Sequence, residues 1–325
     1  MRTRPDHPTL EDVARLAGVS RATAARALTG SGPVRAETRE QVLSAASDLA
    51  YVANRAARAL AAGSGTRLVV AAVTTHRTLT VDPYLARVVA SVAVECGQDG
   101  MGVGLQAVRW DDPSALTSLM RDRDVVGVIL TNGHRRLLES LDPRLAGRVV
   151  SIGVGSEHVP VVDVDGADLA ARMTHHLLDS GRRRIAMIGG PAHVSCTSRP
   201  ISGHVAALAQ AGLPARVTRA GFTTASGRAA AVRVLDLWPD TDAVLVNCDD
   251  AAVGVLETFS AHGRDVPDDI AVTGFDDLPL ASYAGLTSAT HPVEDIAAAA
   301  ARTILDNATE GDRWFSSELV LRRTG

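Results

Sequence analysis

The residues of this sequence whose chemistry is easiest to interpret are two Arg in a short Ala-rich segment near the N-terminus. Arg21 and Arg26 lie in the segment 21–28, directly after Ser20, whose hydroxyl can cap a helix. An Arg guanidinium can donate two hydrogen bonds to one guanine edge, which discriminates between base pairs by ~1–3 kcal/mol. If this helix enters a major groove, Arg21 and Ala22 face base edges and Arg26 lies one turn further along. The segment therefore predicts a DNA-reading helix.

Two further helices are predicted around this segment. Thr9 can cap a helix that begins at Leu10, with Asp12 in the position of the capping-box acid. Gly18 then allows a tight turn before the Arg-bearing helix. A third helix is expected over roughly residues 36–51, and it presents Val42, Leu43, Ala46 and Leu49 to the core. Two helices joined by a Gly-containing turn and followed by a third are typical of a helix-turn-helix unit.

The net charge is unevenly distributed along the chain. All 33 basic residues are Arg, and the total net charge is −4. Residues 1–63 hold nine Arg against six acidic residues, a net charge of +3, whereas the remainder has a net charge of −7. A basic head on an acidic body indicates that only the head meets a polyanion, and it favours a DNA-binding unit over an ordinary helical hairpin.

Motifs of the common enzyme and metal-binding classes are absent from the sequence. There is no nucleophile elbow, P-loop or HExxH motif, and Gly100, Gly102 and Gly104 lack the dinucleotide-binding spacing. The adjacent His175 and His176 point apart on a predicted helix and are poor joint metal ligands. Three widely separated Cys residues exclude a disulfide scaffold. We therefore expect no enzymatic activity, no metal and no cofactor.

From residue 67 onwards, short β-branched runs alternate with amphipathic stretches of helix length, which predicts parallel sheets covered by helices on both faces. The predicted strands are residues 68–73, 103–108, 125–131, 149–152, 184–188, 243–246 and 270–273. The predicted helices include residues 83–96, 166–179, 201–211, 225–235 and 249–262. Residues 182–184, three consecutive Arg, are expected to form a solvated turn. This length exceeds one core, so we expect two lobes that bind a small ligand between them.

The composition is that of a soluble globular protein. Hydrophobic residues make up 46% of the chain and charged residues 22%. No apolar run approaches the ~20 residues that cross a bilayer, and no signal-peptide pattern is present. These features predict a cytoplasmic protein that has no membrane partner.

Residues 9–63 resemble the head of the lactose-repressor (LacI/GalR) family. The resemblance rests on TLEDVARLAGVS, the GSGPV loop, ETREQV and Asn54-Arg55, which occur in the family's order and spacing. It implies that residues 54–62 form a hinge helix, which folds on operator DNA and pairs with its dimer mate, and that Leu60 wedges into the minor groove. The implied DNA-contacting residues are Thr9, Ser20, Arg21, Ala22, Thr23, Arg26, Asn54, Arg55, Ala57 and Leu60.

The rest of the chain resembles the family's periplasmic-binding-protein-like body, most clearly in VVDVDGADLAARMTHHLLDSGRRRIAMIGG and GFDDLPLA. The resemblance implies an all-α helix-turn-helix head and an α/β body of two doubly wound parallel-sheet lobes. The expected boundaries are residues 1–52 for the DNA-binding domain, 53–65 for the hinge helix and linker, and 66–325 for the effector-binding and dimerisation domain. Within the body we expect one lobe over about 66–162 and 291–311, and the other over about 163–290 and 312–325.

The same resemblance implies an effector site. Asp276 in GFDD matches an acid that accepts hydrogen bonds from ligand hydroxyls, and Phe222 matches an aromatic that stacks on the ligand. Asp249 matches the Asp of an Asn-Asp pair, although Cys248 replaces the Asn and Asn247 lies one residue early; Arg199 likewise lies one residue from the family's Arg position. The implied effector-binding residues are Asp82, Tyr84, Arg199, Phe222, Asp249 and Asp276. A purely structural role for the acids, in ion pairs or helix caps, stays open.

The resemblance implies a DNA-binding transcriptional regulator and repressor. It would bind double-stranded, near-palindromic operator DNA as a homodimer, and a small-molecule effector, a sugar, would modulate its operator affinity. One alternative is a ligand-independent regulator with a non-functional cleft. A solute-binding protein would share the two lobes, but it needs a signal peptide and has no use for residues 9–63.

Overall fold

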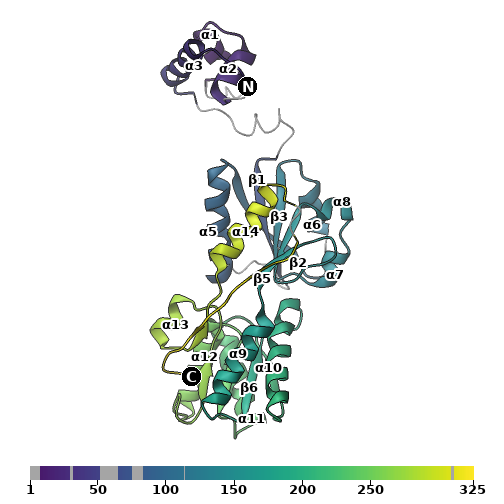
Figure 1. The fold of residues 1–325 in the computed structure, drawn as a ribbon, viewed down its shortest axis with the longest axis vertical. Helices are drawn as coiled ribbons and strands as arrows, with labels where there is room; N and C mark the ends of the chain where they lie inside the picture. The colour runs from purple at the N-terminus through teal and green to yellow at the C-terminus, as the bar shows by residue number, and fades with distance from the viewer. Residues whose placement is uncertain (1–7, 30–31, 52–64, 75–82, 113, 309–310) are drawn as a thin grey trace, which may run out of the picture. The chain divides into compact units, whose positions relative to one another are not determined.

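The computed structural model describes residues 8–29, 32–51, 65–74, 83–112, 114–308 and 311–325 (Figure 1). The chain divides into two compact units, Met1–Gly63 and Ser64–Gly325. The first is a small helical head and the second an α/β body.

Three helices form the head: α1 (Leu10–Leu16), α2 (Arg21–Thr29) and α3 (Ala36–Asp48). The predicted capping box is present at α1, where the Thr9 hydroxyl accepts from the Asp12 N–H and the Asp12 carboxylate accepts from the Thr9 N–H. The turn between α1 and α2 requires Gly18, whose φ is 64°. Ser20 caps α2, because its Oγ accepts a hydrogen bond from the Thr23 N–H at 3.1 Å.

The head core is made of small apolar side chains. Its buried members are Val13, Ala14, Ala24, Ala27, Val42, Ala45 and Ala46. The prediction that Leu43 packs in this core is wrong, because its side chain is 49% exposed. Val42, Ala45 and Ala46 share one face at helical spacing, and Leu43 is rotated about 100° from Val42, towards the exposed side. The helix α3 also ends before the predicted residue 51, with Leu49 as its C-cap.

The first lobe of the body contains a parallel sheet in the order β11-β5-β4-β3-β1-β2. Its strands are β1 (Arg67–Thr74), β2 (Gly102–Arg109), β3 (Val125–Thr131), β4 (Val149–Ile152), β5 (Val161–Val164) and β11 (Arg313–Phe315). Its helices are α5 (Pro83–Gln98), α6 (Ser114–Arg121), α7 (Arg135–Glu139), α8 (Pro143–Ala146) and α14 (Val293–Leu305).

Alternating side chains of β1 build two separate cores on the faces of this sheet. Leu68, Val70 and Ala72 pack in one core with residues of α5 and α14. Val69, Ala71 and Val73 pack in the other with residues of α6 and α7. Because successive strand residues point to opposite faces, an unbroken apolar strand implies a sheet that is covered on both sides, as Figure 1 shows.

The second lobe contains a four-stranded parallel sheet in the order β7-β6-β8-β9 and a separate antiparallel pair, β10 and β12. The strands are β6 (Ile185–Gly189), β7 (Arg216–Arg219), β8 (Ala243–Val246), β9 (Ala271–Thr273), β10 (Ser288–Ala289) and β12 (Leu319–Val320). The helices are α9 (Gly166–Asp179), η1 (Ser195–Thr197), α10 (Ser198–Gln210), α11 (Thr224–Leu237), α12 (Asp249–Ala261) and α13 (Pro279–Ala284).

The helices of this lobe pack in two close pairs, α9 with α10 and α11 with α12. A Cβ added at Gly203 of α10 would overlap the Ala167 carbonyl group of α9, so only glycine allows this helix crossing. The two parallel sheets and their covering helices confirm the predicted fold class of two α/β lobes.

The chain crosses between the lobes after β5, between β10 and α14, and between β11 and β12. Two of these positions are close to the crossovers that the sequence predicts near residues 163 and 290. The first sheet, however, includes Arg313–Phe315 of β11, past residue 311, where we expected the first lobe to end. The strands β5, β7, β10, β11 and β12 were not among the predicted elements; β10 and β12 have only two residues each.

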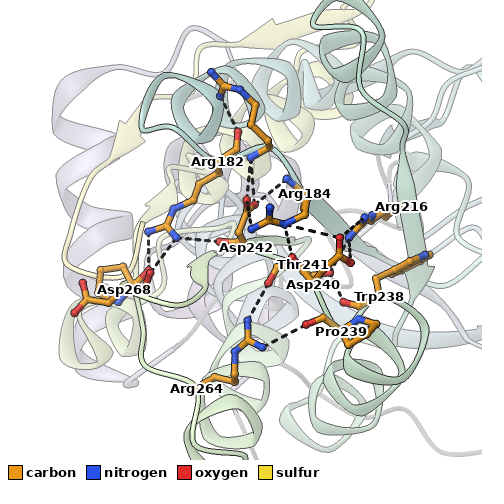
Figure 2. Close-up of polar contacts among 12 residues, drawn as sticks. Arg182, Arg184, Arg216, Trp238, Pro239, Asp240, Thr241, Asp242, Arg264 and Asp268 are labelled. Carbon is orange, nitrogen blue, oxygen red and sulfur yellow. Dashed lines mark hydrogen bonds and ion pairs between the residues drawn. The ribbon is translucent and has the colours of Figure 1, made fainter.

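The turn of consecutive Arg residues is bound to the protein and is not simply solvated (Figure 2). The backbone N–H groups of Arg183 and Arg184 donate to the Asp242 carboxylate, and the Arg182 guanidinium donates to the Pro267 carbonyl at 2.7 Å. These contacts lie before β6 and β8, at the amino ends of the strands. They therefore stabilise the end of the sheet opposite to the carboxyl ends, where such sheets bind ligands.

Candidate functional site

The helix α2 of the head presents its polar residues to solvent. Ser20, Arg21, Ala22 and Arg26 are exposed, whereas Ala24 and Ala27 on the opposite face are buried in the head core. The Arg21 side chain is 71% exposed and lies 3.9 Å from Glu11, so solvent screens this ion pair strongly. The predicted DNA-reading side chains therefore lie together on one open helix face, and Thr9 is exposed at the start of α1.

Several predicted DNA contacts lie outside the described residues. These are Asn54, Arg55, Ala57 and Leu60, together with the whole expected hinge helix. Their roles stay predictions.

The body has a cleft between its two lobes at the carboxyl ends of both sheets. Thr131 and Ile152 end β3 and β4 on one wall, and Asn247 and Gly274 follow β8 and β9 on the other. The empty volume is about 1200 Å3, part of it open solvent. This is the position at which parallel sheets bind ligands, because the loops that follow the strands meet there.

Four of the predicted effector-binding residues line this cleft. They are Tyr84 of α5, Arg199 of α10, Phe222 before α11 and Asp276 after β9. Asp82 lies outside the described residues. The structure thus brings together an acid, a guanidinium and two aromatic rings that the sequence holds far apart.

Asp249 does not line the cleft, contrary to its predicted role. Its side chain is fully buried, and its carboxylate accepts hydrogen bonds from the Leu278 N–H at 2.7 Å and the Ser288 hydroxyl at 2.7 Å. Burial raises the pKa of Asp249 to about 7. The residue therefore anchors the loop after β9 beneath the cleft, and its neighbour Asp250 lines the cleft in its place.

Arg199 reaches the cleft but is already engaged by the protein. Its Nη1 donates to the Gly153 carbonyl of the first lobe at 3.0 Å, and its guanidinium lies 4.6 Å from the centre of the Trp314 ring. The side chain therefore joins the two lobes on one side of the cleft.

The amide of Asn247 lines the cleft although it lies one residue before the family position. Its Oδ1 is buried, and no donor from the described residues reaches it. A buried acceptor without a partner costs about 1–3 kcal/mol, so a ligand hydroxyl that reached this atom would remove that cost. The Cys248 thiol also lines the cleft.

Sequence reasoning missed several cleft residues. Asn132 follows β3 with a φ of 56°, and Phe275 precedes Asp276. Asp163 of β5 and His291 on the crossing before α14 meet at the cleft wall. The Thr-Asn-Gly sequence after an apolar strand was a usable signal for Asn132, but nothing local in the sequence indicates that Asp163 meets His291.

The described part of the chain holds no group of three or more His, Cys, Asp or Glu side chains that could bind a metal ion. None of the helices in that part combines the length and apolar character that a membrane span requires.

Comparison with protein families matches both units. Residues 9–54 match the model of bacterial regulatory proteins of the lacI family, and residues 174–324 match a periplasmic binding protein-like domain. The HTH-type transcriptional regulator CelR of Thermobifida fusca is 35% identical, over 98% of this chain and 96% of its own length.

Solved structures agree with this assignment. A CelR–cellobiose complex is 31% identical, with a TM-score of 0.71, and the match covers 98% of this chain and 100% of that chain. A lac repressor dimer bound to operator and an anti-inducer is 23% identical, with a TM-score of 0.81 over 98% of this chain and 99% of that one, and supports the fold alone. The chain therefore belongs to the lacI family of transcriptional regulators.

Proposed function

We propose that this chain is a repressor that binds a near-palindromic operator as a homodimer, and that a sugar in the cleft modulates its operator affinity. The chemistry of the cleft carries the proposal. Asp276 and Asn247 supply oxygen acceptors for hydroxyl groups, and Tyr84 and Phe222 supply aromatic surfaces from opposite lobes. Acceptors flanked by aromatic rings suit a polyhydroxylated ligand, whose hydroxyls donate while its apolar ring faces pack.

The relatives support a saccharide as the first ligand to test. A cellobiose complex is known for a regulator that is similar over nearly the whole chain. Cellobiose is neutral, so its binding requires no basic pocket, and the Arg199 guanidinium of this chain is already paired with Gly153 and Trp314.

The exposed face of α2 supports the operator-binding half of the proposal. Arg21, Ala22 and Arg26 lie where a major groove would be read, and Ser20 fixes the start of the helix. Coupling between effector and operator sites is typically ~1–3 kcal/mol and is reciprocal. Operator DNA must therefore change the effector affinity by the same factor.

The test uses the full chain. A duplex is selected from a random pool, and its affinity is then measured with cellobiose, other neutral disaccharides and monosaccharides present or absent. We expect one saccharide to raise the melting temperature, because a ligand at ~100 times its dissociation constant adds ~2.7 kcal/mol of stability. The same saccharide should change the operator affinity by about 5- to 150-fold. In vitro transcription from the selected duplex should be reduced by the chain.

Two results would contradict this proposal. Absence of preference for any duplex over random competitor rules out the operator-binding function. Activation of transcription in every ligand state rules out the repressor role.

A ligand-independent regulator is the second candidate, and the engaged state of Arg199 favours it. If the guanidinium permanently joins the lobes, Arg199 does not bind a ligand and the body is a fixed dimerisation scaffold. Sequence-specific operator binding with no melting shift across the saccharide panel would support this candidate over the sugar-responsive repressor.

A further inference from the structure

The imidazole of His291 lies between two carboxylates from different parts of the body. Its Nδ1 is 3.0 Å from Asp276 Oδ1 and its Nε2 is 3.4 Å from Asp163 Oδ1. Asp163 belongs to β5 of the first lobe, His291 to the crossing before α14, and Asp276 to the loop after β9 of the second lobe. The ring therefore joins the lobes at the crossings, inside the cleft wall.

The backbone and two aromatic rings hold this arrangement in place. The Asp276 N–H donates to the Ala289 carbonyl at 3.0 Å, so the loop is attached to the crossing that carries His291. The rings of Tyr84 and Phe275 lie 5.1 Å and 5.3 Å from the imidazole. The His291 side chain is only 8% exposed and the two carboxylates are 12% exposed.

The two carboxylates favour the charged form of the ring. Burial alone would lower the pKa of His291, but the hydrogen bond with Asp276 and the charges of Asp163 and Asp276 outweigh it and raise the pKa to about 9. Nε2 makes no hydrogen bond, so its contact with Asp163 at 3.4 Å depends on the charge of the ring. Loss of the proton removes that charge and leaves both carboxylates without a buried counter-ion from this ring.

We propose that His291 is a positioning residue: as an imidazolium it holds the Asp276 carboxylate in one orientation towards the effector and pairs with Asp163 of β5 in the first lobe. This inference rests on the proposed binding of a hydroxylated effector by Asp276. It adds a specific route by which ligand binding changes the crossings between the lobes. A ligand that displaces the Asp276 carboxylate also changes the contacts of His291 and Asp163.

The titration of His291 must be distinguished from that of other groups near the ring. Those facing His291 and its two partners are Tyr84 and Arg87 of α5, Glu294 of α14, Cys196 and Arg199 near the start of α10, and Cys248, Asp249 and Asp250 at α12. Burial raises the pKa of Cys196 to about 12, and Asp249 has a pKa of about 7. A window from about pH 7.5 to 10 therefore isolates His291 from these two, and a Tyr84→Phe variant removes the phenol while keeping its ring.

The first experiment needs no ligand. Histidine-labelled full chain is titrated by NMR, and the His291 signal is identified as the one missing from His291→Gln. We expect a midpoint well above the ordinary value of ~6.5, and a lower midpoint in Asp163→Asn, which removes one carboxylate. A His291 midpoint at or below ~6.5 in the wild-type chain, or one unmoved by Asp163→Asn, would overturn the proposal.

The second experiment measures binding of cellobiose by calorimetry, or of whichever neutral saccharide binds in the panel. We expect wild-type affinity to fall about tenfold as pH rises through the His291 transition. His291→Gln should show that weaker affinity already at pH 7.5, with a flat profile above it. The matched control is His175→Gln, at an exposed position on α9, which should retain both the affinity and the slope of the wild type.

The outcomes separate this inference from the proposed function. Equal saccharide affinity and equal pH slope in wild type and His291→Gln overturn the role of His291 while sugar binding stands. If no saccharide binds the wild-type chain, the proposed effector class fails. In that case, hydrogen exchange of residues 274–278 and 289–291 tests the role of the ring. After the base-catalysed rise of the intrinsic rate is divided out, protection there should fall above pH 9 in the wild type and not in His291→Gln; the same protection at both pH values in the wild type overturns the positioning role.

Discussion

The guanidinium of Arg199 in the second lobe donates a hydrogen bond to the carbonyl oxygen of Gly153 in the first lobe, at 3.0 Å. Trp314, on β11 of the first sheet, stacks on the same guanidinium. One side chain therefore connects α10 to the loop after β4 and to the strand β11 of the opposite lobe. Arg199 and Gly153 both line the cleft, so this connection forms part of the cleft wall.

Arg199→Lys should loosen the contact between the lobes. An ammonium group lacks the planar face that stacks on Trp314 and cannot keep both contacts, so amides around 153 and 195–199 should exchange faster with solvent. Hydrogen exchange of the full chain measures this. Arg313→Lys is the matched control, because Arg313 stacks on Phe315 within its own strand and spans no cleft. Similar exchange at residue 153 in both variants would argue against the interlobe role.

Arg21→Ala should weaken binding to the selected operator by about ten- to a hundredfold, since one bidentate contact with guanine is worth ~1–3 kcal/mol. Binding to random DNA should change much less, because base readout contributes little there. Competition binding with both duplexes measures the two effects. Arg15→Ala, which removes an exposed Arg of α1 paired with Asp12, serves as the control and should leave the ratio of the two affinities unchanged.

Asp276→Asn and Asp249→Asn should have different effects. The first removes an acceptor on the cleft wall and also the charge that faces the buried His291 ring, so it should lower the saccharide affinity as well as the stability. The second places an NH2 group against one of two buried donors, Leu278 N–H or the Ser288 hydroxyl, and should cost about 1–3 kcal/mol of unfolding free energy. Calorimetry and chemical denaturation distinguish them. If Asp276→Asn lowered the unfolding free energy but not the saccharide affinity, Asp276 would not belong to the effector site.

His204 should make the body less stable in acid. Burial lowers its pKa to about 4 between α9 and α10, where its Nδ1 lies 2.8 Å from the Thr174 hydroxyl. The unfolded chain takes up this proton near pH 6.5, so stability is complete above that pH and falls by up to about 3 kcal/mol as the pH drops to 4.

His204→Asn tests this pH dependence, because the amide can still donate to Thr174 but does not titrate. Between pH 6.5 and 4, the variant should lose less unfolding free energy than the wild type. His175→Asn on the exposed face of α9 should behave as the wild type does. If the unfolding free energies of the wild type and His204→Asn changed equally with pH, the buried ring would not titrate as stated.

Long elements with clear periodicity could be predicted from the sequence, often to the residue. The strand Val125–Thr131 and the helix Gly166–Asp179 are present with the predicted bounds. Leu43 was placed wrongly because Val42 and Leu43 are both apolar, and only the packing of α3 against α1 and α2 decides which of them is buried. The two-residue strands β10 and β12 are too short to have a period.

The candidate site was predicted in part, for a related reason. Tyr84, Arg199, Phe222 and Asp276 could be proposed one at a time from motif positions, and the structure places all four on the cleft. The pairing of Asp163 with His291 depends on how two crossings pass each other, which no local pattern encodes. Asp249 was assigned to the ligand because a motif position does not show whether a carboxylate is already used by backbone N–H groups.

Part of the cleft wall is shared with the apolar cores, because Ile152 and Val164 pack in a core of the first sheet and Met173 and Leu245 in a core of the second. Phe222 also packs against a core of the second sheet. Asn132 and Asn247 line the cleft without belonging to any of these cores. The polar lining of the cleft can therefore be altered at these two loop positions at little cost in packing, whereas a change to its apolar lining also disturbs a core.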